Sequence, residues 1–270
     1  MKIDAETARY YSGLGDLVML AWLAAGAEAG PDPLTFHRKR DLELMALLGL
    51  HVDPEPGGVV LDDVFAAEVA DRGRRPRLEY IARHLGVQTP LARPALRIGD
   101  EDAAWAAATV GQHASPLVLL FPQVAWKPRE WPANYWVDLA WKLKATGAGV
   151  LVMLQAEDPR FTGMPVFQWN TPLPRVAALM QRAALVIGND SFPAHLAGTV
   201  GTPTLALLGP TRPSVFAHMD TVECITSAMD CTGCHFLPPF RAAFDQGCMS
   251  LYQLLPDDVL SRALFHLGRG

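Results

Sequence analysis

The stretch LVIGNDSFPAHLAGTVGTPTLALLGPT, residues 185–211, decides the fold. An apolar strand is predicted to end at Gly188-Asn189, where Ser191 can cap a helix whose second residue is Pro193. After that helix a second apolar strand leads into another turn, Gly209-Pro210-Thr211. The pattern is typical of a strand–helix–strand unit in a parallel sheet.

The predicted turns favour an anionic ligand. Amides in the first turn of a helix have no intrahelical partner, and the helix dipole also favours phosphate oxygens there. Open α/β sheets bind ligands at the edge where the strands end. We therefore expect a phosphate-bearing ligand near Asp190, Ser191 and His195, with Gly209 and Thr211 in the second turn. The alternative is an ordinary βαβ unit in which aspartate and histidine form a buried pair.

The second half of the chain continues this alternation. Strand-length apolar runs cover 116–121, 149–154, 184–187 and 204–208, and helix-like segments cover 134–145, 173–182 and 193–200. Strands this uniformly apolar are expected where helices cover both faces of a sheet. In the first of these helices Asn134 is the predicted N-cap. Its buried stripe comprises Trp136, Leu139, Ala140 and Leu143.

The first half is less regular. Helices are predicted over 16–27, 41–48, 78–85 and 98–110, and a short strand over 34–37. A proline-rich stretch at 89–94 approaches a domain boundary. We expect two domains, an abbreviated N-terminal one over 1–110 and a C-terminal one over 111–270, which contains a cysteine loop at 224–248.

Composition excludes several classes of protein. Half of the 270 residues are hydrophobic and 19% are charged, so the chain can bury a sizeable core. A net charge of −5 argues against a reader of nucleic-acid backbone. The N-terminal residues show no cationic stretch followed by an apolar run, so the sequence predicts no signal peptide. The longest apolar run, 17–27, falls short of the ~20 residues of a membrane span. We expect a cytoplasmic protein.

The run N-D-S-x-x-x-H-L-A-x-x-x-G-x-P-x-x-x-L-x-G-P-T over 189–211 resembles glycosyltransferase family 9, the heptosyltransferases of lipopolysaccharide assembly. The resemblance implies the GT-B architecture, in which two Rossmann-like lobes contain parallel sheets and the C-terminal lobe binds the sugar nucleotide. It implies that Asp190 contacts sugar hydroxyls, that Ser191 touches the diphosphate, and that His195 supports the phosphate end.

Further segments are similar to the family in the same order along the chain. The segment 127–132, KPREWP, supplies Arg129 and Lys127, either of which can neutralise diphosphate charge as the leaving group departs. Glu157, after the run 149–154, is the counterpart of an acidic residue that holds the nucleotide ribose. Because cations and a helix N-terminus can stabilise the diphosphate, we expect no catalytic metal.

Gly13-Leu14-Gly15-Asp16 is similar to the family's N-terminal Gly-x-Gly-Asp turn, which makes Asp16 the predicted general base. The implied reaction is an inverting transfer of a heptose-like sugar from an ADP-heptose-like donor to a hydroxyl acceptor. The first lobe is short for the family, so the acceptor is not assigned. One alternative is a sugar-nucleotide epimerase, and another is a non-catalytic binding or assembly module. For Asp16 itself the alternative is a helix N-cap.

Four cysteines complete the set of candidate residues. Cys231 and Cys234 lie two residues apart, and Cys248 and Cys224 could add two more sulfurs to a structural zinc or iron site. These cysteines also resemble the cysteine-rich tail of many family members, some of which hold a metal in that tail. The spacing matches no standard zinc finger, and the alternative is reduced thiols in a loop, with Cys224 as a core strand residue. A homo-oligomer is a further possibility.

Overall fold

The computed structural model describes residues 14–26, 43–44, 46–48, 67, 70–71, 74–85, 92–236 and 247–269. The chain divides into two compact units, Met1–Ile98 and Gly99–Gly270. The boundary falls before helix α6 (Asp100–Val110), so this helix is part of the second unit. The predicted strand 34–37 lies outside the described residues.

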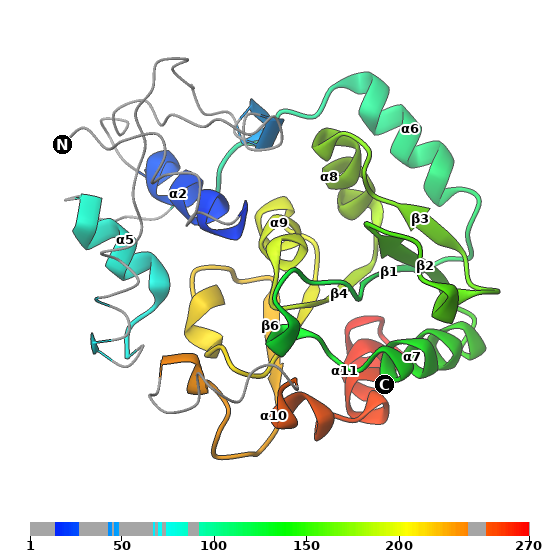
Figure 1. Cartoon of the computed structure of the whole chain (residues 1–270). Coiled ribbons are helices and arrows are strands. Elements are labelled where there is room, and N and C mark those ends of the chain that lie inside the picture. Colours follow the sequence, from blue (N-terminus) through cyan, green and yellow to red (C-terminus); the bar gives the residue numbers. More distant parts are fainter. Residues whose placement is uncertain are drawn as a thin grey trace. The chain divides into compact units, whose positions relative to one another are not determined.

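The second unit is built on one parallel sheet (Figure 1). Its strands are β1 (Leu117–Phe121), β2 (Gly149–Leu154), β3 (Val166–Gln168), β4 (Leu185–Asn189), β5 (Thr204–Leu208) and β6 (Val222–Thr226). They lie in the order β3-β2-β1-β4-β5-β6, and every neighbouring pair is parallel. This is the order of doubly wound α/β sheets, which reverses direction between β1 and β4.

The predicted apolar runs correspond to the four central strands β1, β2, β4 and β5, each buried along its whole length. Neither edge strand, β3 or β6, was among the predicted apolar runs, although the alternative for the cysteines placed Cys224 of β6 in a strand. Most residues of the two edge strands are partly or fully exposed, so they contain no continuous apolar run.

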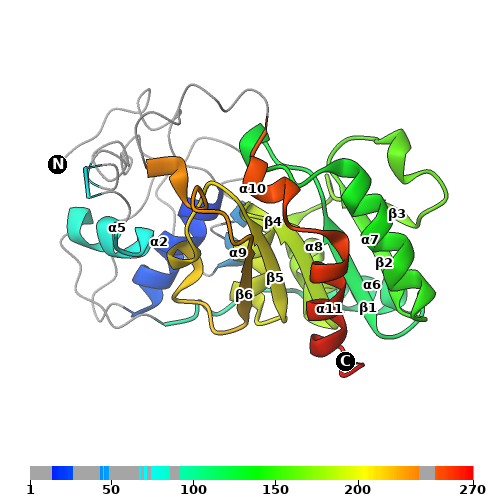
Figure 2. The same ribbon diagram turned by 90° about the horizontal axis from the view of Figure 1, so that it is seen from below.

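Helices cover both faces of the sheet (Figure 2). On one side lie α7 (Ala133–Ala145) and α11 (Pro256–His266). On the other lie α6, α8 (Leu173–Arg182) and α9 (Phe192–Val200). Coverage on both faces explains why the central strands have no polar side.

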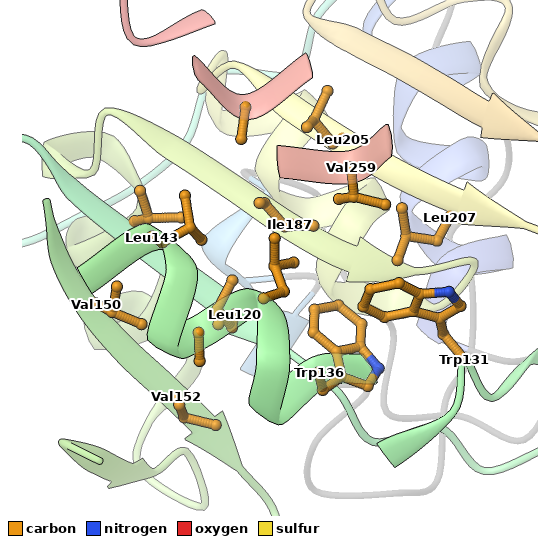
Figure 3. Packing of buried hydrophobic residues seen from close by; sticks show 14 of the residues in the cluster. Leu120, Trp131, Trp136, Leu143, Val150, Val152, Ile187, Leu205, Leu207 and Val259 are labelled. Carbon is orange, nitrogen blue, oxygen red and sulfur yellow. The ribbon is translucent and has the colours of Figure 1, made fainter. Parts of the chain in front are cut away.

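The core on the α7 side contains the predicted stripe. Trp136, Leu139, Ala140 and Leu143 are fully buried, and Figure 3 shows Trp136 and Leu143 beside side chains from β1, β2 and β4. Burying a side chain of this size stabilises the fold by roughly 1.5–3 kcal/mol. The stripe therefore anchors α7 to the sheet.

The predicted cap of α7 was wrong. The carbonyl of Pro132 accepts hydrogen bonds from the amides of Tyr135 and Trp136, at 2.9 and 3.2 Å. The helix consequently begins at Ala133, one residue early, and Asn134 is an exposed residue of its first turn.

The described part of the first unit is helical. Helix α2 (Leu14–Gly26) begins two residues before the predicted start and buries its side chains from Leu17 to Leu23, and α5 (Arg77–Leu85) packs nearby. Leu44 and Leu47, within the predicted helix 41–48, are also buried. No helix in the described residues is long and apolar enough to cross a membrane.

Candidate functional site

The candidate site lies where β1, β4 and β5 end, next to the reversal of strand order. Asn189 is the last residue of β4, Pro122 follows β1, and Gly209 follows β5. Because parallel strands end at a common edge, these turns are neighbours although they are far apart in sequence. The backbone amide of Asp190 donates to Leu207 O at 3.2 Å, which ties the β4 turn to β5.

Asn189 holds the two sides of the reversal together. Its Oδ1 accepts a hydrogen bond from the Trp131 amide at 3.0 Å, and its Nδ2 donates to Pro122 O at 2.8 Å. The side chain is fully buried, so both polar groups need these partners. Asn189 therefore fixes the loop after β1 against the end of β4.

Asp190 carries the buried charge of the site. Its side chain is 2% exposed, and its Oδ2 lies 3.1 Å from Nε of Arg129. The direction of the Nε–H falls outside hydrogen-bond geometry, so this contact is an ion pair, and Arg129 Nη1 also donates to Asp190 O at 3.4 Å. The partner of Asp190 is thus Arg129 and not His195, which removes the simple buried Asp–His alternative.

Arg129 is positioned by its own surroundings. It ends the short 3₁₀ helix η1 (Lys127–Arg129), and its guanidinium lies 5.1 Å from the ring centre of Trp126. The Trp126 ring in turn meets His235 edge-on at 4.8 Å. Lys127, the other predicted cation, is 75% exposed and lies 4.0 Å from Glu130. Of the two cations, the structure brings Arg129 to Asp190.

The N-terminus of α9 has no side-chain cap. Ser191 occupies the N-cap position in an extended conformation, but its hydroxyl donates back to Asn189 O at 3.4 Å. The ring of Phe192, the first residue of the helix, stacks on Trp169 with centres 6.3 Å apart. An uncapped helix start after a buried strand is suited to an anion.

His195 lies inside the core and not on the surface of the site. It is 4% exposed, and its ring stacks on Phe216 of η3 (Pro213–Phe216) with centres 4.3 Å apart. Burial, followed by the charge of His195, lowers the pKa of His218 to about 3, so His218 is neutral at physiological pH. Contact between His195 and a ligand stays a prediction.

The turn after β5 is tightly packed. A Cβ on Gly209 would lie 2.7 Å from Cγ of Leu251, in helix α10 (Met249–Tyr252), and 2.8 Å from Sγ of Cys248, the N-cap of that helix, so a larger residue would force these side chains to shift. The carbonyls of Gly209 and Pro210 accept hydrogen bonds from Gly233 N at 2.9 Å and His235 N at 2.8 Å. These bonds hold the segment 233–235 against the turn.

At the end of β2, Gln123 holds the segment that leads to Glu157. Its Oε1 accepts from the amides of Gln155 and Ala156, at 2.6 and 3.2 Å, and its Nε2 donates to Ala156 O at 3.0 Å. Glu157 itself is exposed. Sequence reasoning missed Gln123 and the clamping role of Asn189. The one available signal was an amide side chain at each of two strand ends.

Asp16, the predicted base, belongs to the first unit. It is the third residue of α2, so it is not an N-cap, and its Oδ1 lies 2.9 Å from Nε of Arg77 on α5. Both side chains are 14% exposed. The ion pair therefore links the two helices as well as holding the carboxylate.

The four cysteines are free thiols. Burial and the charges of Asp190 and Glu223 raise the pKa of Cys224 to about 12, and its Sγ lies 3.8 Å from Pro213 O. Burial and the neighbouring Cys248 and Cys231 raise the pKa of Cys234. Within the described residues no three His, Cys, Asp or Glu side chains are arranged to hold a metal ion. The described geometry thus does not fit the four-cysteine site.

Comparison with solved structures places the fold. E. coli ADP-heptose lps heptosyltransferase II is 17% identical, with a TM-score of 0.53 over 69% of this chain and 57% of that chain. The iron-containing dodecameric glycosyltransferase TibC from enterotoxigenic E. coli H10407 is 17% identical, with a TM-score of 0.56 over 73% of this chain and 54% of that one. The chain thus spans little more than half the length of these structures. No curated protein is similar enough to count as a match.

The doubly wound sheet, with a buried ion pair and a helix N-terminus beside its reversal, defines a Rossmann-like α/β protein. The solved structures confirm the predicted GT-B fold class. Residues 75–235, more than half of the chain, match Glycosyltransferase family 9 (heptosyltransferase). The chain belongs to glycosyltransferase family 9.

The clamp formed by Asn189 gives a direct test of the site's architecture. Asn189→Asp keeps the acceptor for Trp131 N but turns the donor to Pro122 O into a second acceptor. We expect the free energy of unfolding at pH 7.5, measured in urea, to fall by about 2–4 kcal/mol. Burial raises the pKa of the introduced carboxyl. The loss should therefore be smaller at pH 4.5, where the protonated group can donate again.

Gln123→Glu is the matched control, because it makes the same amide-to-carboxyl change at a partly exposed position. We expect it to cost less than about 1 kcal/mol. Equal losses for the two variants would contradict the clamping role of Asn189.

Proposed function

We propose that this chain transfers a heptose-like sugar from a nucleoside-diphosphate donor to a hydroxyl acceptor, with inversion and without a catalytic metal. The observation that carries the proposal is the Asp190–Arg129 ion pair beside the uncapped start of α9. Membership of glycosyltransferase family 9 supports the reaction class. A TibC structure in complex with ADP-D-beta-D-heptose supports ADP-heptose as the first donor to test.

In the proposed reaction the C-terminal unit binds the donor. The Phe192 amide at the start of α9 and the outer edge of the Arg129 guanidinium face the diphosphate, with Ser191 beside them; Pro193 has no N–H, and the Ala194 amide donates to Ser191 O. Asp190 contacts sugar hydroxyls through its second oxygen while it holds Arg129. Glu157, on the segment held by Gln123, binds the ribose. His195, Gly209 and Thr211 support the phosphate end from behind these turns.

Charge development explains how these groups accelerate transfer. As the bond between the sugar and the diphosphate breaks, negative charge grows on the departing phosphate oxygens. Fixed amides and a guanidinium stabilise that charge without rearrangement, which a divalent metal otherwise does. Asp16 takes the proton from the acceptor hydroxyl. The hydroxyl oxygen attacks the sugar carbon on the face opposite the departing diphosphate, so the configuration at that carbon inverts.

A panel of donors tests the proposal. ADP-, GDP-, UDP- and dTDP-sugars are added to the protein, and the midpoint of thermal unfolding is followed. We expect ADP-heptose to raise the midpoint most, since a ligand that binds only the folded state stabilises it. With a hydroxyl acceptor present, nucleoside diphosphate should be released, and release should continue in EDTA. A binding module would bind without release, and an epimerase would change the sugar on an intact nucleotide.

The role of Asp16 can be separated from that of its ion pair. Asp16→Asn removes the proposed base and should lower turnover by ~10²–10⁴ while donor affinity changes only a few-fold. Arg77→Gln breaks the same ion pair but keeps the carboxylate. We expect the two variants to lose similar stability, with turnover retained in Arg77→Gln alone. If both lose turnover equally, Asp16 has a structural role.

A structural zinc or iron ion stays a prediction. The proximity of Cys231, Cys234 and Cys248 favours it, as does the iron of TibC, whereas the described arrangement of ligands does not. With an ion present, elemental analysis should give about one zinc or iron per chain, and Cys231→Ser with Cys234→Ser should remove it. Much less than one metal ion per chain would contradict the predicted site and leave the four cysteines as reduced thiols. TibC is a dodecamer, and light scattering tests the predicted homo-oligomer.

A further inference from the structure

Arg212 is a guanidinium without a counter-ion among the described residues. It follows Thr211 in the turn after β5, its side chain is half-buried, and its Nε is fully buried with no hydrogen-bond partner in that part of the chain. No carboxylate of the described ranges forms an ion pair with it. Ion pairs do exist for Arg77, Arg129, Arg160, Arg175 and Arg262. A half-buried guanidinium that has no carboxylate partner gains from a bound anion, so this position is suited to one.

The backbone of Gly233 provides a seat for this side chain. A Cβ on Gly233 would lie 2.6 Å from Cγ and 3.4 Å from Nε of Arg212. Gly233 also has a φ of +78°, in the left-handed region that favours glycine, and its amide is bonded to Gly209 O. The guanidinium is therefore held in place by packing and does not swing freely in solvent.

A second buried donor lies next to it. Thr211 is 4% exposed, and its hydroxyl has no hydrogen-bond partner among the described residues. A buried hydroxyl left without a partner costs about 1–3 kcal/mol. An oxyanion bound at this turn would accept hydrogen bonds from the outer nitrogens of the Arg212 guanidinium, with the Thr211 hydroxyl on the neighbouring residue as a second donor.

Charge balance at the sheet edge selects Arg212 over the other cations. Asp190 neutralises Arg129, and Lys127 is mostly exposed with Glu130 close by. A diphosphate carries several negative charges, so it gains most from a cation that has no carboxylate of its own. Among the described cations at this edge of the sheet, Arg212 is the one whose guanidinium has no carboxylate partner.

The segment 233–235 connects Arg212 with the rest of the site. Gly233 lies under Arg212, and His235 contacts the Trp126 ring on which Arg129 lies. Strand β5, which leads into the turn that contains Arg212, is also bonded to the turn after β4 through the Asp190 amide and Leu207 O. Both guanidiniums are therefore attached to one packed group of turns at the carboxyl edge.

We infer that Arg212, with the Thr211 hydroxyl, binds a phosphate-type oxyanion of the donor diphosphate. The oxyanion site is argued from the two unpartnered donors and the packing of Arg212, whereas its assignment to the donor rests on the proposed function. The sequence pattern indicated Arg129 and Lys127 as the cations that take up the leaving-group charge. The structure assigns this role to Arg212 as well.

Isothermal titration with inorganic pyrophosphate and with ADP tests the inference without turnover. We expect Arg212→Gln to weaken both by roughly 10- to 100-fold, the effect of losing a charge-assisted hydrogen bond. Arg212→Lys keeps the charge and should lose less, and it remains informative if the glutamine variant does not fold. Thr211→Val, which removes only the hydroxyl, should weaken both a few-fold. Arg182→Gln is the matched control, because Arg182 is exposed and precedes β4 at the opposite edge.

The outcomes separate this inference from the proposed function. Pyrophosphate binding that is undetectable in the parent protein, unchanged in Arg212→Gln, or weakened equally in Arg182→Gln overturns the inference. A parent that binds pyrophosphate through Arg212 but none of the sugar nucleotides supports the inference and contradicts the proposed function. A parent protein that binds the donor sugar nucleotide, with the same affinity in Arg212→Gln, supports the proposed function and contradicts the inference.

Discussion

The buried carboxylate of Asp190 is the charge around which the carboxyl edge of the sheet is arranged. At 2% exposure it cannot rely on water, so Arg129 must reach it. Arg129 can do so because it ends the short helix η1. Two residues further along the chain, the Trp131 amide is bonded to Asn189 at the end of β4, which fixes this loop in place. The Trp126 ring, 5.1 Å from the guanidinium, packs against it as well. The loop after β1 thus takes its shape from one residue at the end of β4.

The central part of the fold was predictable because its strands are buried on both faces. Such strands are apolar over most of their length, and the sequence shows β2 and β5 at their observed bounds. Edge strands such as β6 mix polar with apolar residues and give no such signal. The start of α8 was predicted at its observed residue, whereas α7 begins at Ala133 because the Pro132 carbonyl, and not the Asn134 side chain, takes the first bonds of the helix.

The site was predictable as far as topology carries it. Parallel strands end at one edge, so the sequence pattern alone could place residues from the turns after β1, β4 and β5 together. Which of them pair could not be predicted. Arg129 and Asp190 are 61 residues apart, and whether the carboxylate takes Arg129, Lys127 or His195 depends on loop geometry. The same holds for Cys224, whose Sγ lies 3.8 Å from Pro213 O and whose strand does not bring it into a metal-binding group with the other described cysteines.

The ion pair also limits how a diphosphate can bind. A carboxylate beside a phosphate is repulsive, so the ligand gains from Arg129 only through donors that Asp190 does not use. Breaking the pair to free Arg129 completely would leave Asp190 buried and uncompensated, which costs more than a surface charge could return. The ion pair therefore fixes the position of Arg129, which can donate hydrogen bonds to the ligand, but the pair as a whole has almost no net charge. The balancing positive charge must come from the start of α9 and from a guanidinium that lacks a carboxylate, and among the described residues Arg212 meets that condition.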